Sequence, residues 1–206
     1  MVARTRVKVC GVTSVDQAQA IVDAGIDAIG LVFYTKSPRA VDIDTAKAIC
    51  QSLPPFVQKV GLFVNPERGE VHAILDEVSL DILQFHGDET DEFCRQFGRA
   101  YMKALPVKDR ESIEKNMHAF PGAVGLLLDA YQPDLYGGTG QQFNWDDFPK
   151  HSDKPLILAG GLDADNVAQA IVTCHPYAVD VSSGVEVSKG IKSLEKVHAF
   201  VKAVNS

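Results

Sequence analysis

A thiol and a carboxylate stand at the ends of two apolar segments, in positions suited to proton transfer. Cys10 ends the β-branched run of VKVCGVT, residues 7–13, and Asp129 follows three leucines in LLLDAYQPDLYGGTG, residues 126–140. Low polarity disfavours an ionised carboxyl group, so Asp129 could keep a proton near neutral pH and act as a general acid. Thiolate chemistry at Cys10 would need a lowered pKa, which a neighbouring cation could provide. Lys8 shares the side-chain parity of Cys10 along a strand and could supply that charge.

Each of these two groups also has a purely structural interpretation. Cys10 could be an inert thiol packed in the core, and Asp129 could accept a structural hydrogen bond at the end of a strand. The segment behind Asp129, residues 130–142, is the longest loop expected in the chain and contains three glycines. We expect a mobile lid there, with plain surface disorder as the alternative.

Small residues in two segments near the C-terminus suit an anion. Glycines let backbone N–H groups approach a phosphate, and a helix N-terminus adds partial positive charge. The two segments contain Gly160 and Gly161 in LAGGLDADN, and Ser182, Ser183 and Gly184 in VDVSSGVE. Either segment alone could be a tight turn, but the pair together predicts a phosphate site.

Three further polar residues lie where segments end. Arg39 in FYTKSPRAV can bind a carboxylate through two parallel donors, although an arginine at a rim is usually solvated. His86 in QFHGDE follows an apolar segment, where a lone histidine is more often a hydrogen-bonding scaffold than a ligand. Asp180 ends the apolar run just before the candidate phosphate residues.

The cysteines do not form a metal or disulfide pattern. They are far apart and never occur as C-x-x-C, so neither a zinc site nor a disulfide framework is expected: Cys10, Cys50, Cys94 and Cys174. We predict no metal site and free thiols. The last three fall on expected helices, where a free cysteine usually behaves as a small buried hydrophobe.

Eight apolar segments recur along the chain and are expected to be strands. Their continuous apolar character is typical of a parallel sheet covered on both faces. The expected strands are 5–10, 27–33, 57–63, 81–85, 100–104, 123–129, 155–159 and 177–181. Segments with helical spacing separate or follow them: 15–24, 44–52, 67–78, 90–97, 109–118, a short one near 144–148, 164–173 and 190–204. For 164–173 we expect Asp163 as the N-cap residue.

This alternation predicts an α/β fold, a single closed (β/α)₈ TIM barrel spanning residues 1–206. A doubly wound open sheet would need fewer units or a G-x-G-x-x-G loop after the first strand, which CGVTS lacks. Active sites of such barrels lie at the carboxyl ends of the strands. Cys10 and Asp129 would therefore face each other across the barrel mouth, with the candidate phosphate residues beside them.

Composition restricts the function classes. With 206 residues and 46% hydrophobic residues, the chain can bury about 70% or more of its unfolded surface. A formal net charge of -7, without a run of like charges, argues against nucleic-acid binding or a basic membrane surface. The chain has no stretch of about 18 apolar residues, and its first residues lack a signal-peptide core. We therefore expect a soluble cytoplasmic protein without nucleic-acid or membrane partners.

At this point the sequence resembles the phosphoribosylanthranilate isomerase family along nearly its whole length. The similar stretches are VKVCGVT, GLVFYTKSPRAV, VGLFVN, LQFHGDE, LLLDAYQPDLYGGTGQQFNW, LAGGLDADNV and AVDVSSGVE. The resemblance implies a barrel of the ribulose-phosphate-binding type and an isomerase of tryptophan biosynthesis. Its partner would be a phosphorylated sugar-anthranilate substrate, and the chain would be a monomer or homodimer.

The resemblance also implies roles for individual residues. The family's general base matches Cys10, its general acid matches Asp129, and its anthranilate-carboxylate ligand matches Arg39. The phosphate loops match Gly160, Gly161, Ser182, Ser183 and Gly184, while His86 and Asp180 would have supporting roles in substrate binding. The implied reaction is an Amadori rearrangement of N-(5-phosphoribosyl)anthranilate that needs no metal, nicotinamide or flavin.

Two other function classes stay open. A metal-dependent sugar-phosphate epimerase would use histidine and carboxylate ligands at several strand ends, where only His86 and Asp129 are available. A non-catalytic phosphate-binding barrel would keep the glycines but would need neither Cys10 nor Asp129.

Overall fold

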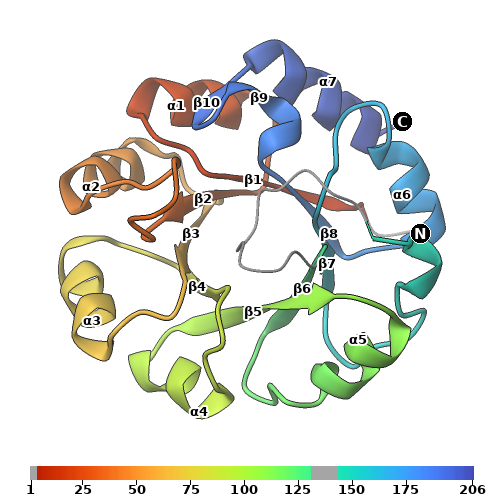
Figure 1. Cartoon of the computed structure of the whole chain (residues 1–206). Coiled ribbons are helices and arrows are strands. Elements are labelled where there is room, and N and C mark those ends of the chain that lie inside the picture. The colour runs from red at the N-terminus through yellow and green to blue at the C-terminus, as the bar shows by residue number, and fades with distance from the viewer. Residues whose placement is uncertain (1–3, 131–142) are drawn as a thin grey trace.

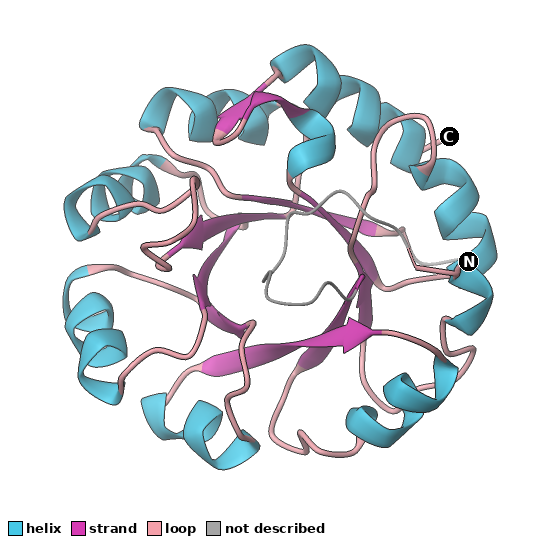
Figure 2. Ribbon diagram, viewed as in Figure 1, coloured by secondary structure: helices cyan, strands magenta, loops and turns pink. Residues whose placement is uncertain are grey.

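The computed structural model describes residues 4–130 and 143–206. Within these residues, eight parallel strands form a closed barrel in the order of the chain, and helices surround it (Figures 1 and 2). The strands are β1 (Arg6–Cys10), β2 (Ala28–Val32), β3 (Gln58–Phe63), β4 (Ile82–Phe85), β5 (Ala100–Val107), β6 (Gly125–Ala130), β7 (Leu156–Leu158) and β8 (Ala178–Val181). Each overlaps one of the expected strands.

The pairing of the first strand closes the ring. Lys8 of β1 lies opposite Ala28 of β2 on one side and opposite Asp180 of β8 on the other. Strands from the two ends of the chain are therefore hydrogen-bonded neighbours. This register confirms the (β/α)₈ barrel and excludes the doubly wound open sheet.

The helices pack around the outside of the barrel (Figure 2). They are α1 (Val15–Asp23), α2 (Ile43–Ser52), α3 (Arg68–Glu77), α4 (Asp91–Cys94), α5 (Arg110–Met117), α6 (Val167–Cys174) and α7 (Leu194–Val204). Several begin at side chains that accept a hydrogen bond from a first-turn backbone N–H: Ser14, Asp42, Thr90, Asp109 and Ser193. Such caps satisfy donors that have no partner inside the helix.

Apolar side chains fill both sides of the barrel wall. The larger core lies between strands and helices and includes Val71 and Ile74 of α3. A smaller cluster, with Val60, Met102 and Leu127, fills the interior of the barrel. This packing gives the functional residues at the open end of the barrel a rigid base.

Three expectations about helices are corrected. The segment expected as a helix over 190–204 begins with β10 (Ile191–Lys192), which pairs with β9 (Glu186–Ser188), and only then becomes α7. Gly190, with φ 82°, makes the turn between these two strands. Near 144–148 there is one 3₁₀ turn, Trp145–Asp147, and 90–97 divides into α4 and a 3₁₀ turn over Arg95–Phe97.

The prediction that Asp163 is the N-cap residue of the helix is also wrong. Its Oδ1 accepts hydrogen bonds from the backbone N–H groups of Asp165 and Asn166, at 2.9 and 3.1 Å. These bonds stabilise a turn ahead of the helix, so α6 begins later, with Asn166 as its cap residue. In the described ranges, 4–130 and 143–206, no helix has the length and apolar character to cross a membrane.

Candidate active site

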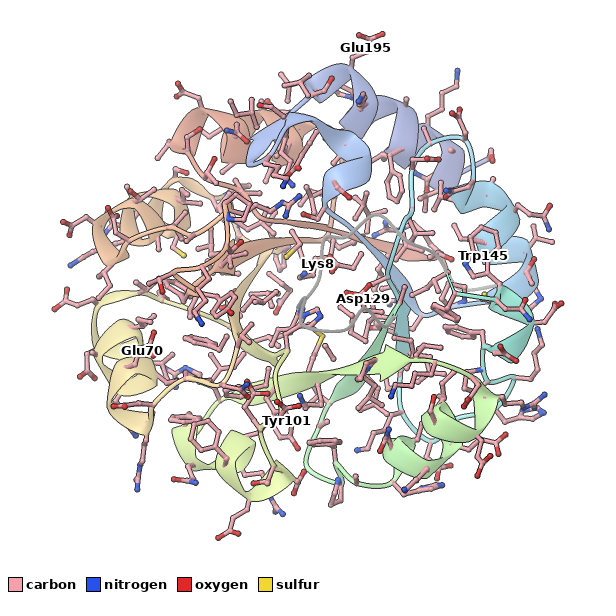
Figure 3. The ribbon with its side chains drawn as sticks, viewed as in Figure 1. Lys8, Glu70, Tyr101, Asp129, Trp145 and Glu195 are labelled. Carbon is pink, nitrogen blue, oxygen red and sulfur yellow. The ribbon has the colours of Figure 1, made fainter. Side chains whose placement is uncertain are left out.

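A cavity lies at the carboxyl ends of the barrel strands. The predicted site residues that line it are Cys10, Arg39, His86, Asp129, Gly160, Gly161, Asp180, Ser182 and Ser183. Cys10 and Asp129 enter it from β1 and β6, which are three strands apart in the ring. Figure 3 shows Lys8 and Asp129 inside the ring of strands. The structure thus brings together the residues that the sequence predicts as a site.

Two glycines, Gly30 and Gly11, leave space for the side chains of Cys10 and Arg39. A Cβ on Gly30, the residue opposite Cys10 in β2, would lie 2.7 Å from Cys10 Sγ. A Cβ on Gly11 would lie 2.5 Å from Cδ of Arg39, and Gly11 has φ 78°. Because a methyl group fits neither place, the backbone around the thiol is restricted to glycine.

The thiol of Cys10 is buried, and burial has the largest effect on its acidity. Burial raises the pKa of Cys10, while the ammonium groups of Lys8 and Lys192 lower it. The net direction is upward, which differs from the lowered pKa expected from a cationic neighbour. Loss of hydration and the nearby carboxylate of Asp180 together disfavour the thiolate more than the two cations favour it.

The side chain of Lys8 is buried inside the barrel, on the same side of β1 as Cys10, as the alternation of side chains along a strand predicts. Its Nζ lies 2.8 Å from Oδ1 of Asp180, and both side chains are at least nine-tenths buried. Burial alone would lower the pKa of Lys8, but the attraction of Asp180 and of a Cys10 thiolate raises it overall. The Asp180 carboxylate therefore favours the charged form of Lys8 and holds its Nζ in place.

Asp129 is held by contacts on both of its oxygens. Oδ1 accepts a hydrogen bond from the backbone N–H of Ala130 at 2.9 Å, and Oδ2 lies 3.3 Å from Nε2 of His86. The other ring nitrogen of His86, Nδ1, lies 3.1 Å from Nε2 of Gln84. Gln84 and His86 thus fix the orientation of the Asp129 carboxyl group at the cavity wall.

A buried ion pair supports the loop that carries His86. Lys103 Nζ lies 3.0 Å from Oε2 of Glu89, and it also donates to the backbone carbonyl of Gly87. Glu89 in turn accepts hydrogen bonds from the backbone N–H groups of Asn65 and Gly87. Sequence reasoning did not identify Glu89, because it lies after the strand in a stretch that is rich in acidic residues.

Arg39 is buried and is not a solvated rim residue. Its Nε and Nη2 donate to the two carboxylate oxygens of Glu186, each at 2.8 Å. Lys192 Nζ also contacts Glu186 Oε1 at 2.8 Å. Glu186 and Lys192 were missed as site residues, because β9 was not foreseen and Lys192 falls in the segment expected to be a helix.

The two candidate phosphate segments are in contact with each other. Gly160 and Gly161 have φ values of 85° and 62°, which few side chains tolerate. A Cβ on Gly184 would lie 1.9 Å from the carbonyl oxygen of Leu162, so Gly184 permits the close approach of the two loops. Ser182 and Ser183 line the cavity, whereas the predicted site residue Gly184 does not.

The lid expected over residues 130–142 lies, apart from Ala130, outside the described residues. In residues 4–130 and 143–206, no group of three or more histidine, cysteine or carboxylate side chains has an arrangement that could hold a metal ion. The metal-free reaction stays a prediction for experiment.

Comparisons with known proteins agree on one family. The family model described as N-(5'-phosphoribosyl)anthranilate (PRA) isomerase matches residues 7–203. The N-(5'-phosphoribosyl)anthranilate isomerase of Azotobacter vinelandii is 55% identical over 204 residues, which cover 99% of each chain. The crystal structure of phosphoribosyl anthranilate isomerase from Thermotoga maritima has a TM-score of 0.90 and 38% identity, with 98% of both chains covered.

A further similar structure contains a ligand. It is phosphoribosyl anthranilate isomerase in complex with reduced 1-(o-carboxyphenylamino)-1-deoxyribulose 5-phosphate, with a TM-score of 0.84 and 35% identity over 98% of both chains. A carboxyphenylamino sugar phosphate therefore binds to a protein of the same fold that is more than one-third identical to this chain.

Proposed function

Because the chain belongs to the N-(5'-phosphoribosyl)anthranilate isomerase family, we propose that it performs this isomerisation with Asp129 as general acid and Cys10 as general base. The substrate is N-(5-phosphoribosyl)anthranilate, and the product is 1-(2-carboxyphenylamino)-1-deoxyribulose 5-phosphate. One observation carries the proposal: an acid and a thiol enter the same cavity from β6 and β1. They can therefore act on opposite sides of one bound sugar.

The first step opens the ribose ring. Asp129 gives a proton to the ring oxygen, the bond from C1 to that oxygen breaks, and the nitrogen lone pair forms an iminium with C1. His86, 3.3 Å from Oδ2, keeps the carboxyl group directed at the cavity. A fixed acid of this kind contributes about 10²- to 10⁴-fold to the rate.

The second step removes the proton from C2. The Cys10 thiolate takes that proton, and the electron pair of the C–H bond neutralises the iminium, leaving an enolamine that tautomerises to the ketone. A raised pKa makes the thiolate scarcer but a stronger base, and the positive iminium near it favours its formation. The ammonium groups of Lys8 and Lys192 also favour the thiolate form of Cys10.

Binding of the two anionic ends positions the sugar between the acid and the base. We assign the anthranilate carboxylate to Arg39, and the phosphate to Gly160, Gly161, Ser182 and Ser183, with Gly184 setting their spacing. Asp180 has a supporting role through Lys8. The phosphate assignment rests on the glycine backbone geometry and on the contact between the two loops.

The test is an activity measurement on the purified chain. Freshly generated N-(5-phosphoribosyl)anthranilate should be converted to the deoxyribulose product, with substrate loss followed by the fluorescence of its anthranilate group. Phosphate binding without turnover would favour the non-catalytic barrel. Turnover that requires an added divalent ion would favour the metal-dependent alternative.

Three broader expectations from the sequence belong to the same proposal. We treat residues 1–206 as one catalytic domain, supported by the pairing of β1 with β8. We place the enzyme in the cytoplasm, where tryptophan biosynthesis needs it, and expect a monomer or homodimer without nucleic-acid or membrane partners. Sedimentation analysis and a single unfolding transition would test the oligomeric state and the one-domain assignment.

A further inference from the structure

We propose that Glu186 is a positioning residue that directs the guanidinium of Arg39 toward the carboxylate of the substrate, with Lys192 as its counter-ion. The inference rests on the proposed function, because it assigns the substrate carboxylate to Arg39. It adds two buried charged residues of the β9–β10 ribbon to the substrate site, although neither of them lines the cavity.

The contact between Glu186 and Arg39 leaves one edge of the guanidinium for a ligand. A guanidinium has a side edge, formed by Nε and one Nη, and an end edge, formed by both Nη atoms. Glu186 accepts from the side edge, at 2.8 Å to Nε and 2.8 Å to Nη2. The end edge keeps two parallel donors, which match a second carboxylate.

The charges of the group favour an anion. Arg39, Glu186 and Lys192 have exposed fractions of 8%, 7% and 6%. Two cations face one buried carboxylate, so the three side chains together have an excess of one positive charge. Glu186 therefore stabilises both cations where they are buried from water, and one positive charge remains to attract the substrate carboxylate.

Lys192 connects this group to the candidate phosphate loop. Its Nζ lies 2.8 Å from Glu186 Oε1 and donates to the backbone carbonyl of Ser182 at 3.2 Å. Burial lowers the pKa of Lys192, and the Glu186 carboxylate opposes that effect. Lys192 thus links Glu186 to the backbone of this loop, although Lys192 itself does not line the cavity.

The ribbon is fixed to α1, to α7 and to the loop before α1, so it can serve as a rigid support. Thr13 Oγ1 donates to the carbonyl of Gly190 at 2.7 Å, and the backbone N–H of Lys192 donates to Gln17 Oε1 at 3.2 Å. Lys196 Nζ donates to the backbone carbonyl of Glu186 at 2.8 Å. Figure 1 shows β9 and β10 beside α1 and α7, outside the ring of barrel strands.

The test compares Glu186→Gln with the wild-type enzyme. A neutral amide cannot accept from both donors of Arg39, so the guanidinium loses its fixed orientation. We expect KM to rise about tenfold, the effect of losing a hydrogen bond to a charged group, while kcat stays within about threefold. The matched control is Glu77→Gln, which removes a carboxylate from an exposed pair with Lys47 and should leave both constants unchanged.

Two ligand fragments separate positioning from a general structural role. The inhibition constant of anthranilate should rise in Glu186→Gln by the same factor as KM, whereas that of inorganic phosphate should change less than about twofold. Equal weakening of both fragments would show loss of structure at the rim and would overturn the proposal. An unchanged KM would overturn it as well.

A second variant, Glu186→Asp, keeps the test informative if Glu186→Gln fails to fold. Glu186→Asp keeps the negative charge but shortens the reach, so its KM should lie between those of the wild type and Glu186→Gln. The Arg39→Lys variant lacks the guanidinium edge that Glu186 binds. Adding Glu186→Gln to this variant should therefore raise KM by much less than Glu186→Gln does in the wild type. If Glu186→Gln raised KM by the same factor in Arg39→Lys as in the wild type, Glu186 would not act through Arg39 and the proposal would be wrong. Absence of wild-type turnover would instead refute the proposed function, and titration with anthranilate would still test the positioning role.

Discussion

Gly30→Ala should inactivate the enzyme by moving the thiol of Cys10, although the substituted residue has no chemical role. The new Cβ would lie 2.7 Å from Cys10 Sγ and 3.1 Å from Cys10 Cα, where ordinary contacts are about 3.5–4 Å. The thiol must therefore move by about 1 Å, because the backbone of β1 is paired on both sides. Misplacement of a reacting group by that amount can reduce the rate about 10²-fold.

The fold should survive this change with a moderate cost. Overpacking by one methyl group costs about 1–3 kcal/mol in free energy of unfolding. The measurements are kcat and KM with the isomerase substrate, together with the free energy of unfolding in urea. KM should change little, because the three heavy atoms nearest to the new Cβ all belong to Cys10 and none belongs to the residues assigned to phosphate or carboxylate.

A matched glycine substitution controls for the addition of a methyl group itself. Gly69 lies in α3, and a Cβ there would have no heavy atom within 4 Å. Gly69→Ala should keep wild-type kcat and gain about 0.4–1 kcal/mol of stability. If folded Gly30→Ala turned over at the wild-type rate, the thiol position would not matter, and the reasoning about Cys10 would be refuted.

Three further predictions concern the ligands and the acidity of the site. Arg39→Lys should raise KM more than it lowers kcat, because an ammonium keeps the charge but loses the paired donors; an unchanged KM in steady-state assays would remove Arg39 from the site. Exhaustive treatment with a chelator should leave the rate unchanged, and loss of activity restored by a divalent ion would contradict the metal-free mechanism. The raised pKa of Cys10 means that the thiolate fraction grows as pH rises through and above the usual thiol range near about 8.5, so single-turnover rates should increase from neutral to alkaline pH until another group intervenes. That increase should disappear in Cys10→Ala, and its persistence would assign it to a different group.

The barrel was predictable because its signals are local. Each strand is a continuous apolar run, and residues such as Cys10, His86 and Asp129 were placed at strand ends by where those runs stop. A closed ring then brings the strand ends together whatever the intervening loops do. This explains how separate motifs could be assigned to one end of the barrel, where they line a common cavity.

The parts that could not be predicted depend on contacts between distant segments. Glu186 and Lys192 are linked to Arg39 across about 150 positions of the chain, and no local pattern reports such a pair. The helical spacing of α7 also concealed the short ribbon before it. The acidity of Cys10 depends on the balance between burial, the Asp180 carboxylate and two lysines, which sequence parity alone does not determine.

The central claim is that Cys10 removes the proton from C2, and the most direct test is the turnover of Cys10→Ala under conditions in which the chemical step limits the rate. The account predicts a loss of about 10²-fold or more in kcat with the fold intact, nearly the same loss in Cys10→Ser, and a comparable loss in Asp129→Asn. A well-folded Cys10→Ala protein that retained more than about half of the wild-type kcat would show that the thiol is packing, and the mechanism would be wrong.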